Sequence, residues 1–582
     1  MCLVEVVLRR HRNTHPRKAG RLQLPASNPR QRRWRLRRNP HAGDLRLTHY
    51  PPLVQRLLES RGIATAPQAE AFFDGYDECD PFALPDIEKA IARLSHAAST
   101  GETVAVFGDF DVDGITSVAL LTEALRSLGA QVIPYIPDRF DEGYGLNAPA
   151  ISRLHADGAT LLAAVDCGTS SVDDVAHASS LGMDTVIIDH HLPAERLPDA
   201  IALVNPKIAP SDGPDLDLAT AGLVYYLLIA LYESLGRPFP DNRFLDLAGL
   251  GTVSDMAPLH RANRSLVRRG LEAVRESERC GLQALMSVAG VDPSRADTEA
   301  MSFMLGPRLN AAGRLAHARL SLDLLLCDDA DAAREMARRL DSLNRQRQRL
   351  TAKALDLAWS LLEEDGASLV MVGHGDIPPG VAGLVASRIA ETLYRPAVVY
   401  QRGEKVSRGS GRSIPEFDVA AALRGCDDLL LRCGGHQQAA GFTADNAHLP
   451  AIKERLIAHA EERLAGLDLV PTVDVDAEVG LRELGREEIR WLAKLAPHGV
   501  GNPQPALLSR GVTVAECRVV GSDGKHLRLT LKDGYSTWPA IAFGLGDVRV
   551  SEGQRVDVVF SLSSDRRDGS LQLTVHDLVP ST

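Results

Sequence analysis

The sequence of 582 residues lacks the features that would place it in several special classes of protein. No uninterrupted apolar run approaches the roughly 18 residues of a membrane-spanning helix, which excludes a membrane span. The eight cysteines are scattered without a CxxC pair, so neither a disulfide framework nor a cysteine-based zinc site is expected, and a reducing cytoplasm is favoured. With 45% hydrophobic and 24% charged residues, the composition is that of an ordinary globular protein. A chain of this length should form two to four domains.

Acidic residues are nearly absent from the start of the chain. The overall net charge is -11, but residues 1–38 hold twelve Lys and Arg and one acid, Glu5, a net charge of +11, so the remainder carries -22. This start lacks the apolar core and cleavage site of a signal peptide. We interpret residues 1–44 as a disordered basic tail; the alternatives are a start codon placed too far upstream, a transit peptide, and a tail that adds affinity for phosphate. The acidic balance of the whole chain would ordinarily argue against a nucleic-acid partner.

The apolar pattern predicts a multidomain α/β protein. Residues 45–325 begin with helical spacing and then alternate short apolar strands with helices, which is typical of a parallel sheet covered by helices on both faces. Residues 326–365 are a polar run that predicts a long connecting helix. Residues 366–465 predict a smaller α/β domain. Residues 466–582 contain five short strands separated by turn residues, which favours a small closed β-barrel of the oligonucleotide-binding (OB) type.

The strongest signal for a functional site is the run Asp109-Phe110-Asp111-Val112-Asp113-Gly114, directly after the predicted strand TVAVFG. Three carboxylates so close together repel one another, and a bound divalent cation would hold them ionised. A calcium-binding EF-hand loop begins in the same way. However, that loop needs a glutamate at its twelfth position, where Leu120 stands, and a helix where a strand is predicted.

Further candidate ligands follow other predicted strands. Asp166 ends LLAAVD, the triplet Asp189–His191 ends TVIID, and Asp255 follows LAGLGTVS. A lone aspartate at such a position is usually a helix N-cap, but capping does not explain four clusters with six aspartates and two adjacent histidines. Ligands bind at the carboxyl ends of parallel strands, and carboxylate with imidazole suits Mn²⁺ and related ions. We therefore predict a site for two ions about 4 Å apart, with Asp166 as a bridge.

These motifs resemble those of the DHH phosphoesterase superfamily and, within it, the RecJ family of single-stranded-DNA exonucleases. The DxDxDG, DxG, DHH and GTxxDxxPL elements occur in family order, and similarity continues through GPRLNAAGRL, LNRQRQ, GSGRS, GGHQQAAGF and HGVGNPQP, over about residues 33–580. The resemblance implies a DHH catalytic domain, a DHH-associated substrate-binding domain and an OB-fold nucleic-acid-binding domain. The sequence departs from the family at residues 377–381, where Ile-Pro-Pro-Gly-Val replaces the usual Trp-His-x-Gly-Val. Because no metal ligand is lost, we expect this change to affect substrate placement or rate.

The resemblance also implies an activity and a set of site residues. The activity is a metal-dependent 5′–3′ exonuclease that degrades single-stranded DNA to 5′-mononucleotides in recombination and repair, using two Mn²⁺ or Mg²⁺ ions. The implied metal ligands are Asp111, Asp113, Asp166, His190 and Asp255. Two further catalytic residues lie beside them, Asp109 and His191, and His191 would orient or polarise the scissile phosphate. The implied contacts to DNA or phosphate are Arg139, Tyr144, Arg308, Asn310, Arg314, Ser410, Arg412 and His436.

Partners and alternatives complete the prediction. The family implies a substrate with a 5′ end, a RecQ-type helicase and a single-strand-binding protein as partners, a monomer, and a bacterial cytoplasmic location at the nucleoid. One alternative is a small-substrate DHH phosphodiesterase acting on oligoribonucleotides or cyclic dinucleotides, which the predicted barrel and GPRLNAAGRL disfavour. The other is a non-catalytic single-strand-binding relative, which the complete set of aspartates and histidines disfavours. Five basic residues of the barrel are candidate contacts to the DNA backbone: Lys525, His526, Arg528, Arg566 and Arg567.

Overall fold

The computed structural model describes residues 32–37, 47–75, 79–208, 217–362, 366–521, 524–565 and 568–581. The chain divides into two compact units. Among the described residues, the smaller comprises those of Leu355–Pro471 with Arg32 and Arg33, and the larger comprises those of Trp34–Ala354 and Thr472–Thr582. Within the described ranges, no helix is long and apolar enough to cross a membrane.

The larger unit contains a five-stranded parallel sheet in the order β3-β2-β4-β5-β6. Its strands are β2 (Thr103–Phe107), β3 (Gln131–Tyr135), β4 (Leu161–Val165), β5 (Asp184–Ile188) and β6 (Ala202–Val204). The chain moves outward from β2 to β3 on one side and from β4 to β6 on the other. The strand order therefore reverses between β2 and β4, and open α/β sheets bind ligands at such a reversal.

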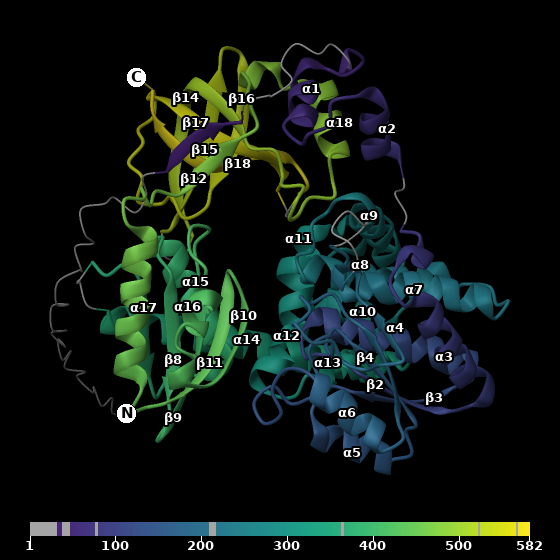
Figure 1. The fold of residues 1–582 in the computed structure, drawn as a ribbon. Coiled ribbons are helices and arrows are strands. Elements are labelled where there is room, and N and C mark those ends of the chain that lie inside the picture. Colours follow the sequence, from purple (N-terminus) through teal and green to yellow (C-terminus); the bar gives the residue numbers. More distant parts are fainter. Residues whose placement is uncertain are drawn as a thin grey trace, which may run out of the picture. The chain divides into compact units, whose positions relative to one another are not determined.

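Helices cover both faces of this sheet, as the alternating pattern predicted (Figure 1). On one face, apolar side chains of β2 and β4 pack with α5 (Ala148–Ala156) and α6 (Val172–Ser180). On the other face they pack with α3 (Ile87–Thr100), α4 (Val112–Leu128) and α7 (Thr220–Ser234). Because each strand is covered on both sides, its residues are almost continuously apolar.

The remaining helices of this part of the chain follow the sheet in sequence. They are α8 (Asp241–Ser254), α9 (Arg261–Arg275), α10 (Cys280–Ala289), α11 (Thr298–Ala300), a π-helical turn (Met301–Leu305), α12 (Gly306–Leu315) and α13 (Arg319–Leu325). The polar run after them forms one helix of 32 residues, α14 (Ala330–Leu361), as its composition predicted. Short 3₁₀ turns occur at Pro81–Ala83, Pro206–Ile208, Pro293–Arg295, Asp427–Leu429 and Leu481–Glu483.

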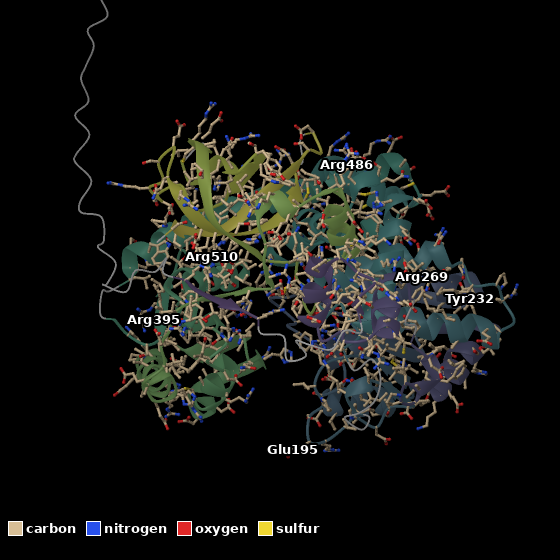
Figure 2. The ribbon with its side chains drawn as sticks, turned by 90° about the horizontal axis from the view of Figure 1, so that it is seen from above. Glu195, Tyr232, Arg269, Arg395, Arg486 and Arg510 are labelled. Atoms are coloured by element: carbon tan, nitrogen blue, oxygen red, sulfur yellow. The ribbon has the colours of Figure 1, made fainter. Side chains whose placement is uncertain are left out.

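The C-terminal part of the larger unit is a closed β-barrel, as predicted. Its strands are β14 (Leu507–Val520), β15 (His526–Asp533), β16 (Ser536–Ala542), β17 (Arg555–Ser564) and β18 (Leu571–Pro580). They run in the order β14-β15-β16-β18-β17, and β17 pairs back with β14 to close the barrel. A short strand, β13 (Ala477–Glu478), joins β14 at its start. Arg510 lies on the outside of β14, where its guanidinium pairs with Glu478 and Asp557 (Figure 2).

Two N-terminal helices belong to the hydrophobic core of this barrel rather than to that of the parallel sheet. They are α1 (Pro52–Glu59) and α2 (Ala66–Asp74). Their buried side chains join one cluster with those of the barrel and of α18 (Arg486–Lys494). Residues 47–75, part of the segment that we grouped by sequence with the parallel sheet, therefore pack with residues from the other end of the chain.

The basic N-terminal segment is structured where the structure describes it. Arg33–Leu36 form β1, which pairs with β12 (Thr472–Val475). The indole N–H of Trp34 donates to Asp577 at 2.8 Å, and Arg35 pairs with Asp474 at 2.6 Å. The predicted disorder therefore does not hold for Arg33–Leu36, where the basic side chains meet acids of the C-terminal region. The rest of the predicted tail lies mainly outside the described residues.

The smaller unit is built on a five-stranded sheet in the order β10-β11-β9-β8-β7. Its strands are β7 (Val370–His374), β8 (Ala397–Arg402), β9 (Val406–Arg412), β10 (Leu430–His436) and β11 (Ala439–Asp445), and its helices are α15 (Pro379–Leu393), α16 (Val419–Arg424) and α17 (Leu449–Leu464). Only β7 and β8 run parallel. The sequence pattern predicts strands at SLVMVG, PAVVY and GRSI. The first two coincide with β7 and β8, whereas GRSI overlaps only the last two residues of β9. The pattern did not predict that the segment GGHQQAAGF forms the hairpin of β10 and β11.

Candidate metal centre

The DxDxDG segment joins β2 to α4 and places three carboxylates at the sheet's carboxyl edge. Asp111 is the N-cap of α4, and its Oδ1 accepts a hydrogen bond from the Gly114 N–H at 3.1 Å. The carboxylate of Asp113 accepts from the N–H groups of Thr220 (2.8 Å) and Ala221 (2.9 Å), at the start of α7. Two helix N-termini therefore point toward these carboxylates and stabilise their negative charge.

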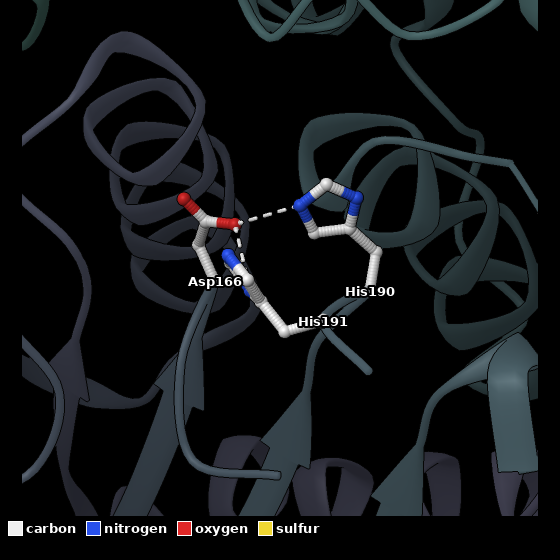
Figure 3. Close-up of side chains that lie close together, drawn as sticks. All are labelled: Asp166, His190 and His191. Carbon is white, nitrogen blue, oxygen red and sulfur yellow. Dashed lines mark ion pairs between the residues drawn. The ribbon is translucent and has the colours of Figure 1, made fainter. Parts of the chain in front are cut away.

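Asp166 and the two histidines converge on the same place. Asp166 follows β4 in a left-handed conformation (φ 61°), which costs energy for a residue with a side chain and is enriched at functional sites. Its Oδ1 lies 3.5 Å from Nε2 of His190 and 4.0 Å from Nδ1 of His191 (Figure 3). The same oxygen accepts a hydrogen bond from the hydroxyl of Thr220 at 2.9 Å.

Asp255 reaches the site from a helix, so our prediction that it follows a strand was wrong. It is the C-cap of α8, and its Oδ2 lies 3.8 Å from Nδ1 of His190. The run LAGLGTVS resembled a buried strand because it is short and largely apolar. It is instead the end of a helix whose sides are nearly all buried, and such a helix shows no apolar stripe.

Among the residues that the structure describes, three sets of side chains could each hold a metal ion. Within each set, one ligand atom per residue lies within 4.8 Å of the others; the sets are Asp166, His190 and His191; Asp113, His190 and Asp255; and Asp109, Asp111 and Asp166. Asp166 and His190 each belong to two sets. The site also fits a cation by its unsatisfied acceptor, because the buried Oδ1 of Asp109 has no hydrogen-bond partner. Carboxylates with imidazole are ligands that suit Mn²⁺ and similar ions.

The buried carboxylates strain one another electrostatically. Burial, and then the neighbouring charge of Asp111, raises the pKa of Asp113 to about 7. Burial, and then the charges of Asp113 and Asp111, raises the pKa of Asp255 to about 9. The pKa values of Asp109 and Asp166 are raised for the same two reasons. Without a cation, the cluster therefore holds protons at neutral pH.

We expect Mn²⁺ affinity to increase with pH between pH 6 and 8. A cation binds the ionised carboxylates, so it must displace protons, and the affinity should rise about tenfold per pH unit for each proton displaced. Titration calorimetry in two buffers of different ionisation enthalpy measures this proton release. The stability of the metal-free protein should change in the opposite direction with pH. Its raised carboxyl pKa values, such as those of Asp113 and Asp255, make its free energy of unfolding fall as the pH rises from about 4 toward 9. A Mn²⁺ affinity that is the same at pH 6 and pH 8 would contradict the prediction.

Asp189 serves the site by orienting His191. Its carboxylate accepts from Nδ1 of His191 at 2.7 Å and from the backbone N–H groups of Thr169, His190 and His191. Burial alone would raise the pKa of Asp189, but the hydrogen bond and charge of His191, with the bonds from Thr169, hold it below its usual range. Burial opposes the charged imidazole of His191, yet Asp189 raises the pKa of His191 above its ordinary value. The pair therefore favours a cationic imidazole in a fixed orientation.

Two supporting residues were missed by the sequence reasoning. Thr220 binds Asp166 through its hydroxyl, and Asn205 donates to the hydroxyl of Thr169 (2.9 Å) and to the carbonyl of His191 (2.8 Å). The position of Asn205 after β6, at the carboxyl edge of the sheet, was the one available signal. Thr220 carried none, because it begins a helix that is almost entirely apolar.

Two predicted DNA contacts lie beside these ligands. The guanidinium of Arg139 stacks over the ring of Phe110 at 4.7 Å from its centroid. Burial lowers the pKa of Arg139, and the charges of Asp109 and Asp111 oppose that shift. Tyr144 is 54% exposed, and its hydroxyl donates to the carbonyl of Asp166 at 3.3 Å. Its ring also lies 5.5 Å from that of His191, so the structure brings it to the metal centre.

The three residues predicted on the GPRLNAAGRL segment lie on α12. The guanidinium of Arg308 pairs with Asp341 of α14 at 3.0 Å and donates to the carbonyl of Met304. Asn310 and Arg314 are half-buried on the same helix. Arg308 therefore links two helices in this structure.

The three residues predicted in the smaller unit lie together on its sheet. Arg412 of β9 pairs in register with Ala439 of β11, which pairs with His436 of β10. The guanidinium of Arg412 donates to the hydroxyl of Ser410 at 2.8 Å, and His436 is exposed. The GSGRS and GGH motifs thus share one surface.

Comparisons with known proteins agree with this architecture. The DHH family N-terminal domain matches residues 103–252, the DHHA1 domain residues 365–466, and the RecJ OB domain residues 475–577. The single-stranded-DNA-specific exonuclease RecJ of Bacillus subtilis is 36% identical over 542 residues, covering 91% of this chain and 68% of that protein. The same enzyme of Escherichia coli is 35% identical over 560 residues, covering 91% and 96%. The crystal structure of RecJ with Mn²⁺ from Thermus thermophilus superposes with a TM-score of 0.82 at 32% identity, covering 94% of this chain and 80% of that one.

The parallel sheet, its cluster of aspartates and histidines and the attached DHHA1 domain define a DHH-family protein that uses divalent metal. Within that class, the sequence identity over nearly the whole chain and the match to the RecJ OB domain identify the family. The chain belongs to the RecJ family.

Proposed function

We propose that this chain is a divalent-metal-dependent exonuclease that degrades single-stranded DNA from its 5′ end and releases 5′-mononucleotides. The observation that carries the proposal is the meeting of Asp, His and backbone N–H groups at the carboxyl edge of the sheet, at the reversal between β2 and β4. Relatives with identities of 34–36% over about nine tenths of this chain are named single-stranded-DNA-specific exonucleases.

Five side chains would hold two ions, Mn²⁺ or Mg²⁺: Asp111, Asp113, Asp166, His190 and Asp255. The membership of Asp166 and His190 in two ligand sets each supports two ions that share these residues, with Asp166 as the bridge. Such ions lower the pKa of a bound water and neutralise charge that develops on a phosphate. Asp109 would adjoin the ligands, and the imidazole of His191, oriented by Asp189, would bind the scissile phosphate.

Arginines and an aromatic side chain would hold the DNA. Arg139 is close enough to Asp109 and Asp111 to feel their charges, which suits a guanidinium that grips a phosphate at the metal centre. Tyr144 presents an exposed ring for stacking on a base, a contact of about 1–3 kcal/mol. The other proposed contacts are Arg308, Asn310 and Arg314 on α12, and Ser410, Arg412 and His436 on the smaller unit. Arg308 would have to exchange its pair with Asp341 for the phosphate.

The proposed function also includes a cellular location, partner proteins and further contacts to DNA. It would act as a monomer at the bacterial nucleoid in recombination and repair, together with a RecQ-type helicase and a single-strand-binding protein. In the barrel, Arg528 is paired weakly with Asp565 at 3.8 Å and stays a candidate for contact with the DNA backbone, with Lys525 and His526. Two other candidates, Arg566 and Arg567, lie outside the described residues.

A nuclease assay with Mn²⁺ tests the activity and its polarity. The substrates are a single-stranded oligonucleotide with a 5′ phosphate, the blunt duplex and a cyclic dinucleotide. We expect mononucleotide release from the single strand alone, with a label at the 5′ end released first and a label at the 3′ end last. Equal rates on single strand and duplex would refute strand selectivity. Cleavage of the cyclic dinucleotide alone would favour the small-substrate enzyme, and binding of the single strand without cleavage would favour the non-catalytic relative.

A further inference from the structure

The motif HGVGNPQP, residues 498–505, lies between α18 and β14, and the metal centre described above does not include it. Its first residues pack against the segment that joins α8 to α9, which begins at Asp255. The N–H of Leu259 in that segment donates to the carbonyl of Val500 at 2.7 Å. A loop that precedes the barrel therefore contacts the chain four residues beyond a proposed metal ligand.

The segment between α8 and α9 is strained and depends on its surroundings. Met256 in this segment and Arg261, the first residue of α9, have φ values of 61° and 41°, a left-handed conformation that costs about 1–2 kcal/mol per residue with a side chain. Such a conformation persists where neighbouring structure fixes it. Two contacts do so here: the bond from Leu259 to Val500, and a bond from the amide of Asn263 to the carbonyl of Pro258 at 3.0 Å.

The loop at residues 498–503 is itself held rigidly against this segment. Gly499 and Asn502 exchange backbone hydrogen bonds of 3.0 and 3.2 Å. The hydroxyl of Thr298 donates to the carbonyl of His498 at 2.7 Å. A Cβ atom added at Gly499 would lie 2.8 Å from Cδ1 of Leu259. The side chain of Leu259 is 2% exposed and belongs to the main core, so it has no space to move aside.

We infer that the loop formed by residues 498–503 is a positioning element of the metal centre. It fixes Leu259, and through the short strained segment it sets where the carboxylate of Asp255 stands relative to His190 and Asp113. The inference rests on the proposed function for the role of Asp255 as a ligand. It assigns to the region preceding the barrel an effect on metal affinity that is separate from any contact of the barrel with DNA.

The substitution Gly499→Ala tests this inference by pushing on Leu259 without touching a proposed ligand. Mn²⁺ binding to the full chain, measured by calorimetry without DNA, should weaken about tenfold, because partners that orient ligands contribute about 10–100-fold to metal affinity. The matched control is Gly553→Ala. Gly553 has φ 81° and no atom within 4 Å of an added Cβ, so alanine there strains the barrel but leaves Leu259 in place. Its Mn²⁺ affinity should stay within about twofold of that of the unaltered protein.

A second pair of variants covers the case in which Gly499→Ala does not fold. Thr298→Val removes the hydroxyl that binds the carbonyl of His498, whereas Thr298→Ser keeps it. We expect weaker Mn²⁺ binding for the valine variant and near-normal binding for the serine variant. Equal Mn²⁺ affinity in Gly499→Ala and Gly553→Ala, or in the two Thr298 variants, would overturn the inference alone. Absence of Mn²⁺ binding by the unaltered protein would overturn the proposed function and the inference with it.

Discussion

Replacement of Asp166 by alanine is expected to lower kcat/KM on single-stranded DNA by more than about 100-fold and to abolish tight Mn²⁺ binding. Asp166 is 2% exposed and belongs to two of the three ligand sets, so its loss would disturb both proposed ions. Loss of a group that only orients a ligand already costs about 10–100-fold, and a shared ligand should cost more. Steady-state kinetics at saturating Mn²⁺ and calorimetry on the same preparation measure the two effects.

Two further variants calibrate this result. Thr220→Val removes the hydroxyl that donates to Asp166 at 2.9 Å and should lose about tenfold in Mn²⁺ affinity. Asp173→Ala removes an exposed carboxylate near the start of α6, a few residues along the chain, and should change neither quantity by more than about twofold. Unaltered Mn²⁺ affinity in Asp166→Ala would exclude Asp166 as a ligand.

Replacement of Arg264 by alanine is expected to destabilise the larger unit by about 3–4 kcal/mol. The guanidinium of Arg264 is buried and donates to three successive carbonyls just after α18: those of Leu495 (3.2 Å), Ala496 (2.8 Å) and Pro497 (3.2 Å). It also stacks over the ring of Phe72 at 4.0 Å from its centroid. Alanine would remove the side-chain donor to the carbonyl of Ala496, a loss of about 1–3 kcal/mol, and would leave a cavity. The carbonyls of Leu495 and Pro497 would keep one donor, the side-chain amide of Asn502.

The charged form of Arg264 is disfavoured by its surroundings, and a lysine variant separates the effect of the charge from that of the guanidinium geometry. Burial, and then repulsion from Arg268 and Arg61, lowers the pKa of Arg264 to about 10. Arg264→Lys keeps the positive charge, but an ammonium group cannot reach three carbonyls as a planar guanidinium does. We therefore expect the free energy of unfolding of the lysine variant to lie between those of the wild type and the alanine variant. Arg268→Ala, which removes a donor to the carbonyl of Phe73, should cost about 1 kcal/mol. Urea denaturation measures the free energy of unfolding of all three variants. A decrease of less than 1 kcal/mol in Arg264→Ala would contradict the prediction.

The sequence predicted the parallel sheet and the barrel because the strands of both produce a recognisable local pattern of apolar residues. Strands covered on two faces are continuously apolar, as in TVAVF, and barrel strands alternate in twos, as in HLRLTL. The candidate ligands Asp111, Asp113 and Asp166 follow such strands, so their meeting at one edge could be expected. Asp255 was misplaced because α8 is buried on nearly all sides and shows no helical stripe.

Other parts of the fold depend on contacts between distant residues, which leave no local record. The hydroxyl of Thr220 and the amide of Asn205 become informative only when α7 and β6 are placed beside Asp166 and His191. Likewise, the helical pattern of α1 predicted a helix but not that its apolar face joins the barrel. Local spacing gave the elements, and tertiary packing decided their partners.

The packing of α1 and α2 has a consequence for synthesis. These helices leave the ribosome before the parallel sheet, yet their buried apolar side chains share a core with residues such as Leu481 and Leu492, which follow more than 400 positions later. At about 5–20 residues per second, their apolar faces wait roughly 20 to 80 seconds for a covering surface. During that interval the completed sheet can fold as a unit while the N-terminal helices remain a binding site for chaperones. The core that contains α1 and α2 should therefore form only when the last part of the chain has been synthesised.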